Sequence, residues 1–199
     1  MEIKTLIIWI ILGYLIGSIP WGLIIGKVFF HKDIREFGSH NLGGTNAARV
    51  LGLPIGILVI ILDAMKAFLL MIVCNVYAPE VIEYSGLAVC IGHCFPIFAQ
   101  FKGGKAVSCS YGYLLGLYIF VTHDPLTLLV PLGIFIVMLL TFKMVSLASM
   151  SGLFLGSIYL LFTQGKVGML VLLLSIFVIY RHSSNIKRII NKTESKIKL

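Results

Sequence analysis

The chain has 199 residues, of which 59% are hydrophobic and only 12% are charged, and its mean hydropathy is +1.03. A soluble domain of this length could not hide so much apolar surface in its interior, so the composition excludes one and predicts that a lipid bilayer surrounds most of the chain. The net charge of +8 is not accompanied by an aromatic and basic recognition module, so no nucleic-acid partner is expected.

Seven apolar stretches follow one another along the chain, each near the ~20 residues needed to cross the hydrocarbon core. They cover roughly residues 3–26, 53–74, 81–101, 107–122, 125–142, 144–163 and 166–180. The first run continues to about Phe30 without an Ala-x-Ala cleavage pattern, so it is interpreted as a retained transmembrane helix. The sequence predicts a single all-α domain over residues 1–199, a polytopic integral membrane helix bundle of about seven transmembrane helices. Five or six crossings are alternatives, because "THDP" (Thr122 to Pro125) is the only break in 107–142.

The basic residues predict the orientation of this bundle. With seven spans, only Lys4 and Lys166 of the sixteen Lys and Arg residues fall on one side, and Lys66 lies inside a span. Cytoplasmic loops carry the excess of Lys and Arg, so the N-terminus is expected outside and the C-terminus in the cytoplasm.

This topology brings three polar, Gly-rich segments to the cytoplasmic edge of the membrane. They are "GSHNLGGTNAAR", "FKGGKA" and "RHSSNIKR". Each alone has a structural interpretation, as an interhelical loop, a turn with positive-inside lysines and a basic surface tail. Because all three lie at one membrane face, they are expected to converge on one site.

The first segment has the composition of an anion-binding loop, because its glycines let backbone N–H groups turn toward an anion and polar side chains add donors. The glycines are Gly38, Gly43 and Gly44, and the donors are Ser39, Asn41, Thr45 and Asn46. A helix that begins near Thr45 would point its positive end at the loop, and Arg49 could then bind two phosphate oxygens. The chain has no Walker-type or Gly-x-Gly-x-x-Gly pattern, so a phosphate compound smaller than a nucleotide is favoured.

The other two segments add charge and an imidazole. Lys102 and Lys105 flank Gly103 and Gly104, whose bare backbone permits close approach of a ligand. In the third segment, His182 and Asn185 are three apart and would share a helix face. A lone histidine at a membrane edge is more often structural.

Within the predicted spans, Asp63 and Lys66 are three apart and are expected to form an ion pair facing the bundle interior. Gly92, His93 and Pro96 would break the third span, and His93 is expected to satisfy a freed backbone carbonyl. The four cysteines form no Cys-x-x-Cys pair, and Asp and Glu together number only eight. Reduced packing cysteines are therefore expected, and a metal site is not.

Five stretches together carry a resemblance to a known family over nearly the whole chain. They are "GSIPWG" (Gly17 to Gly22), "DIREFGSHNLGGTNAARVLG" (Asp33 to Gly52), "LDAMKA" (Leu62 to Ala67), "GHCFPIFAQFKGGKAV" (Gly92 to Val107) and "RHSSNIKRIINKTE" (Arg181 to Glu194). With these motifs in this order, the chain resembles PlsY, the acyl-phosphate:glycerol-3-phosphate acyltransferase family of bacteria.

The resemblance implies a multi-pass enzyme of the bacterial cytoplasmic (inner) membrane that needs no cofactor. Such an enzyme moves a fatty acyl group from acyl phosphate to the sn-1 hydroxyl of glycerol-3-phosphate, the first step of phospholipid synthesis, and releases lysophosphatidic acid and phosphate. The implied partners are these two substrates, membrane lipid and an enzyme that produces acyl phosphate.

The resemblance also implies roles for the residues of the three motifs. Glu194 is implied to be structural. The expected catalytic residues are Ser39, Arg49, Lys105, His182 and Asn185. The expected substrate-binding residues are Asn41, Gly43, Gly44, Thr45, Asn46, Lys102, Gly103 and Gly104.

The chain departs from the family pattern at four positions. His40 stands where glycine is usual, Gly44 where alanine is common, and Ala67 and Ala106 where glycine is expected. These departures leave open a diverged relative that transports small anions or phosphate esters, or a silent membrane scaffold. Against a transporter, the polar motifs gather at one membrane face and no inverted repeat is visible.

Overall fold

The structure, a computed structural model, describes residues 2–197 and is helical, with no strand among those residues. The chain forms two compact units, one ending at Gly116 and the other beginning at Leu117. All seven apolar stretches predicted from the sequence are mainly helical, although 3–26 and 81–101 are each interrupted. The single domain over residues 1–199 stays a prediction, and its residues 1, 198 and 199 lie outside the described part of the chain.

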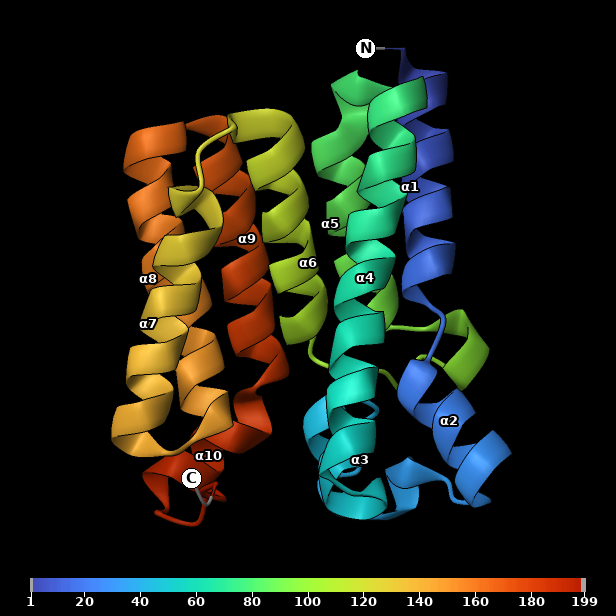
Figure 1. Cartoon of the computed structure of the whole chain (residues 1–199), viewed down its shortest axis with the longest axis vertical. Coiled ribbons are helices and arrows are strands. Elements are labelled where there is room, and N and C mark those ends of the chain that lie inside the picture. The colour runs from blue at the N-terminus through green and yellow to red at the C-terminus, as the bar shows by residue number, and fades with distance from the viewer. Residues whose placement is uncertain (1, 198–199) are drawn as a thin grey trace. The chain divides into compact units, whose positions relative to one another are not determined.

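The first unit is built on three long apolar helices, α1, α4 and α5, which pack against one another (Figure 1). Its elements are α1 (Ile3–Gly17), α2 (Trp21–Phe30), η1 (Ile34–Glu36), α3 (Gly44–Leu51), α4 (Leu53–Tyr77), η2 (Pro79–Val81), α5 (Ile82–Cys94), η3 (Ile97–Ala99) and α6 (Val107–Leu117). Helices α1 and α5 can approach closely at Gly17 because glycine has no Cβ. A Cβ there would collide with the backbone of Val89. Small residues at such crossings are typical of helix packing in membranes.

The first apolar run, interpreted as a retained transmembrane helix, forms one candidate span, Ile3–Phe30, but its helix is broken between α1 and α2. Pro20 lacks a backbone N–H, and the Ser18 hydroxyl donates to the Tyr14 carbonyl, 2.7 Å away. A helix that breaks within a membrane span needs partners for its freed carbonyls. The ammonium of Lys66 on α4 supplies one, lying 2.8 Å from the Gly17 carbonyl and 3.1 Å from that of Ile19.

The second unit is an array in which α8 packs on both α7 and α9. Its elements are the short π-helix η4 (Tyr118–Thr122), α7 (Leu126–Phe142), α8 (Val145–Gln164), α9 (Lys166–Arg181) and α10 (Ser183–Ile190). The chain bends by 62° between α9 and α10, at His182. Beyond α10 the tail returns to the end of α7, where the Ile197 N–H donates to the Lys143 carbonyl at 2.8 Å.

Four helical segments among the described residues are long and apolar enough to cross a membrane, and five if the bent pair α9 and α10 counts as one span. They are Ile3–Phe30, Leu53–Tyr77, Pro79–Ala99 and Val145–Gln164. Only 39% of the most apolar window of Leu53–Tyr77 is buried, so much of its apolar surface is left to face lipid. The shorter apolar helices Val107–Thr122 and Leu126–Phe142 fall below this length. The seven-span count and the orientation of the termini stay predictions.

Candidate functional site

The first Gly-rich loop, between η1 and α3, is organised around the buried side chain of Asn46. Its amide nitrogen donates to three backbone carbonyls, those of Ile34 at 2.8 Å, Asn41 at 2.9 Å and Phe37 at 3.2 Å. Its carbonyl oxygen accepts the Ser39 N–H at 2.8 Å. Because Asn46 is only 1% exposed and its amide is committed to backbone groups, we expect it to shape the loop more than to contact a substrate.

The loop turns through two left-handed residues, Gly38 at φ +62° and His40 at φ +56°. A Cβ at Gly38 would collide with the Asn46 side chain, so glycine is required there. His40 adopts the same conformation with a side chain, whose Nδ1 lies 2.9 Å from the Arg35 carbonyl. This backbone geometry explains why glycine suits the position where the chain departs from the family pattern.

The start of α3 carries the groups that were predicted to bind an anion. The helix begins at Gly44, one residue before the predicted position, and Asn41 fixes its entry by accepting the Gly43 N–H at 2.9 Å. Within residues 2–197, the N–H groups of Gly44 and Thr45 donate to no other group, and the exposed Arg49 guanidinium makes no ion pair. A helix N-terminus with free N–H groups and a nearby guanidinium can bind phosphate oxygens.

The second predicted segment lies against the first. The Asn41 amide nitrogen is 3.5 Å from the Gly103 carbonyl, a contact at the limit of hydrogen bonding. Arg35 adds a second link, donating from its guanidinium to the Ala99 carbonyl at 3.3 Å. Lys102 is exposed, whereas Gly103 and Gly104 are buried. The structure therefore brings together two of the three segments that were expected to converge.

Beside the first loop, the Asp33 carboxylate forms an ion pair with Arg35. Asp33 accepts the Arg35 side chain at 2.7 Å and pairs with Lys27 at 3.3 Å. The hydrogen bond from Arg35 is the main reason that the pKa of Asp33 lies far below its usual range, and burial opposes it only in part. The same carboxylate raises the pKa of Arg35. Arg35 is thus committed to structure, in contrast to Arg49.

The third segment, in the second unit, is organised around Glu194, whose side chain is 6% exposed. One carboxylate oxygen accepts from Ser146 and from Asn185, each at 2.6 Å, and the other accepts from Arg188 at 2.7 Å. Burial acts to raise the pKa of Glu194, but these three hydrogen bonds outweigh it and lower the pKa. The contacts support the structural role implied for Glu194, and they anchor Asn185.

His182 occupies the bend between α9 and α10 and is 3% exposed. Its Nδ1 lies 2.7 Å from the Val178 carbonyl. A carbonyl can only accept, so Nδ1 carries a proton in this contact. This contact fixes the orientation of the ring at the bend. How this segment lies relative to the first two stays a prediction.

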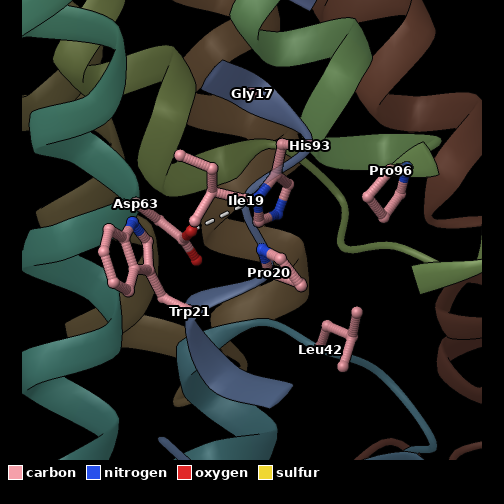
Figure 2. Close-up of a pocket in the computed structure, with 8 residues that line it drawn as sticks. All are labelled: Gly17, Ile19, Pro20, Trp21, Leu42, Asp63, His93 and Pro96. Carbon is pink, nitrogen blue, oxygen red and sulfur yellow. Dashed lines mark ion pairs between the residues drawn. The ribbon is translucent and has the colours of Figure 1, made fainter. Parts of the chain in front are cut away.

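The buried polar side chains of the first unit form a cluster. The predicted ion pair is confirmed, with the Lys66 ammonium 3.0 Å from Asp63 and both side chains at most 3% exposed. The expectation for His93 is wrong, because its ring meets charged groups rather than a carbonyl. Its Nδ1 lies 2.9 Å from the Lys66 ammonium and 3.4 Å from the Asp63 carboxylate. Asp63 and His93 line a narrow hollow together with Pro20, Trp21 and Leu42 (Figure 2).

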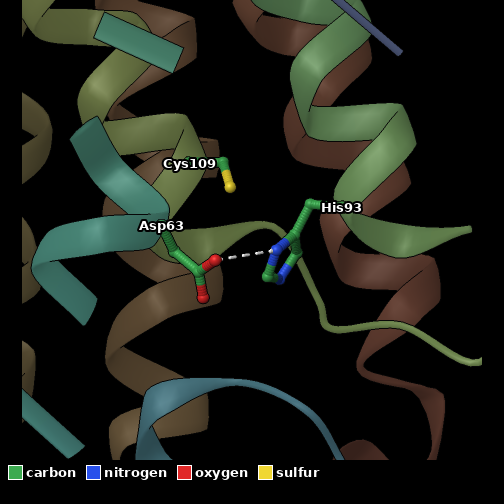
Figure 3. Close-up of side chains that lie close together, drawn as sticks. All are labelled: Asp63, His93 and Cys109. Atoms are coloured by element: carbon green, nitrogen blue, oxygen red, sulfur yellow. Dashed lines mark ion pairs between the residues drawn. The ribbon is translucent and has the colours of Figure 1, made fainter. Parts of the chain in front are cut away.

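Asp63, His93 and Cys109 also point toward one another closely enough to resemble a metal site (Figure 3). The Lys66 ammonium, however, contacts Asp63 and His93 as well as two backbone carbonyls. A cation is thus already built into the chain at this position, so the donor set does not fit a metal ion. The spacing of Asp63 and Lys66 predicted their pairing, whereas no sequence signal joined His93 to them.

Apolar helices of membrane-spanning length, joined by polar, Gly-rich loops, are typical of an integral membrane protein. Residues 7–192 match the family described as glycerol-3-phosphate acyltransferase. Glycerol-3-phosphate acyltransferases of Bacillus velezensis and Bacillus subtilis are 49% and 47% identical over 191 residues, which cover 95% of this chain and 96% of each relative. The chain therefore belongs to the glycerol-3-phosphate acyltransferase family, which confirms the resemblance given by its motifs.

Solved structures agree with this assignment. A crystal structure of the integral membrane glycerol 3-phosphate acyltransferase PlsY in its glycerol 3-phosphate form is 32% identical, with a TM-score of 0.86 over 97% of this chain and 96% of that one. The lysophosphatidic acid form gives 31% identity and a TM-score of 0.81 over 97% and 95%. The protein is thus an acyltransferase of bacterial membranes, and its family implies a place in phospholipid synthesis.

Proposed function

We propose that the protein transfers a fatty acyl group from acyl phosphate to the sn-1 hydroxyl of glycerol-3-phosphate, giving lysophosphatidic acid and inorganic phosphate. The main support is the start of α3, where the N–H groups of Gly44 and Thr45 donate to no other group within residues 2–197. This helix bears the exposed Arg49, and the loop before it contacts a second, lysine-bearing loop. Two phosphate-bearing substrates need two such sets of donors.

The chemistry suits a site made of donors and cations. The hydroxyl oxygen of glycerol-3-phosphate attacks the acyl carbon, the carbon–oxygen bond to phosphate breaks, and phosphate leaves with that electron pair. Because phosphate is already a good leaving group, the enzyme has only to position the substrates, neutralise their charge and exclude water. We assign the acyl-phosphate head to the first loop, and glycerol-3-phosphate to Arg49, Lys102 and Lys105.

Ser39, Asn41, Gly43, Gly44, Thr45 and Asn46 form the first loop of this proposal, and Gly103 and Gly104 form the second. His182 and Asn185 complete the site from the third segment. We propose that the departing phosphate accepts the hydroxyl proton and that His182, through Nε2, orients the substrate. The active site would face the cytoplasm, where an enzyme that produces acyl phosphate could supply the donor.

The test is phosphate release by the purified protein in detergent or lipid cubic phase, with palmitoyl phosphate as donor. Release that requires glycerol-3-phosphate and yields lysophosphatidic acid would support the proposal. Arg49→Ala is expected to abolish release, and Arg49→Lys to restore little, because an ammonium cannot reproduce the planar two-point contact. Folded protein that releases nothing from palmitoyl phosphate, yet carries phosphate esters across vesicle membranes, would contradict it in favour of a transporter.

A further inference from the structure

The buried cluster of Asp63, Lys66 and His93 lies where two helices of the first unit break. Helix α1 ends at Gly17, and helix α5 ends at Cys94, one residue after His93. All three cluster side chains are at most 7% exposed. Charged groups inside a membrane protein are costly and are retained where they have a specific task.

Lys66 secures the first of these breaks. Its ammonium lies 2.8 Å from the Gly17 carbonyl and 3.1 Å from the Ile19 carbonyl, at the end of α1 where the helix dipole is negative. The Asp63 carboxylate at 3.0 Å balances the charge of Lys66. These contacts hold the ammonium in place, and they also hold its position relative to His93.

His93 links Lys66 to the second loop, which it meets through two contacts. Its Nδ1 lies 2.9 Å from the Lys66 ammonium, and its backbone carbonyl accepts the Gly104 N–H at 3.0 Å. The opposite edge of the ring, Nε2, lies against Gly104, where a Cβ would collide with it. The imidazole is thus held between the charged pair and the glycine backbone of the loop.

The neighbouring segment depends on the same support. Gly103 packs against the carbonyls of His93 and Cys94 and against the ring of Pro96, and a Cβ there would collide with the His93 carbonyl. Gly103 also carries the carbonyl that meets Asn41 of the first loop. A shift of His93 would therefore move the two glycines that stand between Lys102 and Lys105.

We propose that Asp63, Lys66 and His93 are positioning residues that hold the 102–105 loop where it binds the phosphate of glycerol-3-phosphate. The proposal rests on the function proposed above for that loop. The cluster acts through the His93 ring and touches no substrate itself.

The contact between His93 and Gly104 allows a direct test by a double-mutant cycle. In His93→Asn, the amide takes the place of Nδ1 beside Lys66 and Asp63, and the edge that touches Gly104 is removed. In Gly104→Ala, a methyl group is pushed against the intact ring. We expect each change to raise the KM for glycerol-3-phosphate about ten-fold, within the range of coupling between contacting residues, with kcat and the KM for acyl phosphate nearly unchanged.

The double variant separates positioning from general damage. With the ring edge gone, the methyl group added at Gly104 has room, so the two effects are expected to be less than additive. Additive effects, or equal changes in kcat and in both KM values, would overturn the proposal. Two matched controls are expected to be silent: Gly133→Ala, where a Cβ would meet nothing within 4 Å, and His123→Asn, at an exposed left-handed position.

Binding of radiolabelled glycerol-3-phosphate to the detergent-solubilised protein, without any acyl donor, distinguishes the two proposals. A wild type that binds the label but fails to use palmitoyl phosphate would contradict the proposed donor and still test the cluster. Equal affinity in wild type and His93→Asn would overturn the cluster proposal whatever the donor result. If the buried cysteines react with a thiol dye in His93→Asn, the variant is unfolded. Lys66→Gln then replaces it, because Lys66 meets only the Nδ1 edge of the ring.

Discussion

The first loop, between η1 and α3, and the third segment are each organised around one buried side chain, but the two side chains differ in charge. Asn46 is neutral, and it holds its loop through backbone carbonyls and one N–H. Glu194 is a carboxylate, and it holds its segment through Ser146, Asn185 and the cation of Arg188. Both segments are therefore ordered by a buried hydrogen-bonding side chain, but only the third segment places a negative charge at its centre.

The difference in charge between Asn46 and Glu194 decides which arginine stays available to a substrate. A neutral centre leaves Arg49 of the first loop without a competing carboxylate, so its charge is available to phosphate. In the third segment, Glu194 pairs with Arg188. The side chains that this segment holds in place are the amide of Asn185 and, nearby, the imidazole of His182. We infer that the first loop supplies charge and the third segment supplies orientation.

Giving the neutral centre a charge is expected to have the largest effect. Asn46→Asp keeps the shape of the side chain but turns its donor into an acceptor that faces three carbonyls. A buried charge without a partner costs about 3–5 kcal/mol, so we expect loss of activity and a much lower unfolding temperature. Asn46→Ala loses the hydrogen bonds without adding charge and is expected to cost less, about 1–3 kcal/mol.

The four cysteines make this comparison measurable, because Cys74, Cys90, Cys94 and Cys109 are all buried in the same unit as Asn46. The temperature at which a thiol-reactive dye labels them reports the unfolding of that unit. If Asn46→Asp were as stable as Asn46→Ala, the hydrogen-bond directions assigned to the amide would be wrong.

The next effect is expected at His182, which tests the orienting role of the third segment. Replacement by Ala is expected to lower kcat by no more than ~10²-fold if the ring only orients substrate. A loss near ~10⁴-fold would identify His182 as the general base instead of the departing phosphate. His182→Asn, which keeps a donor for the Val178 carbonyl but loses Nε2, is the matched variant and is expected to behave like Ala.

These two residues also show what the sequence could and could not reveal. Local features were predictable: the helical stretches, the start of α3 near Thr45 and the ion pair of Asp63 and Lys66 follow from periodicity and spacing. The role of Asn46 was not, because an asparagine in a Gly-rich loop has the same sequence signature whether it binds a ligand or the backbone.

Contacts between distant residues escaped prediction for a different reason. His93 meets Lys66 across 27 positions, and Ser146 meets Glu194 across 48, so neither pair has a periodicity that one sequence can display. The break after α1 was missed because the apolar composition continues through Pro20, and composition alone does not show where Lys66 will supply a partner for freed carbonyls. The motifs identified the segments, and packing decided which of their side chains are structural.

A moderate effect is expected when the charged centre is neutralised by Glu194→Gln. The folded-state pKa of Glu194 is lowered, so its contribution to stability is present above the unfolded-state pKa of about 4.3 and is lost as the pH falls. The variant should lose about 1–3 kcal/mol at neutral pH and show a weaker decline of stability in acid than the wild type. Thermal unfolding followed by circular dichroism between pH 7 and pH 3 measures both.

Asp33→Asn is the matched comparison, since the pKa of Asp33 is also lowered, by its hydrogen bond with Arg35. It should remove another part of the acid-induced loss of stability. An acid decline that is unchanged in both variants would show that neither carboxylate contributes to it.

The smallest effect is expected at His40, where the first loop departs from the glycine usual in its family. The residue is exposed at φ +56°, so substitutions there test the backbone with little change in packing. His40→Gly relieves the left-handed strain but loses the contact with the Arg35 carbonyl and gives the unfolded chain more freedom. We therefore expect a change in stability of less than about 1 kcal/mol and activity within about two-fold of the wild type.

His40→Val, with a β-branched side chain in the same conformation, is expected to cost about 1–2 kcal/mol and to raise the KM for acyl phosphate, because this loop is proposed to hold its head group. Equal thermal stability and KM in both variants would mean that the loop does not depend on its left-handed turn, and that the departure at His40 has no consequence for the anion site.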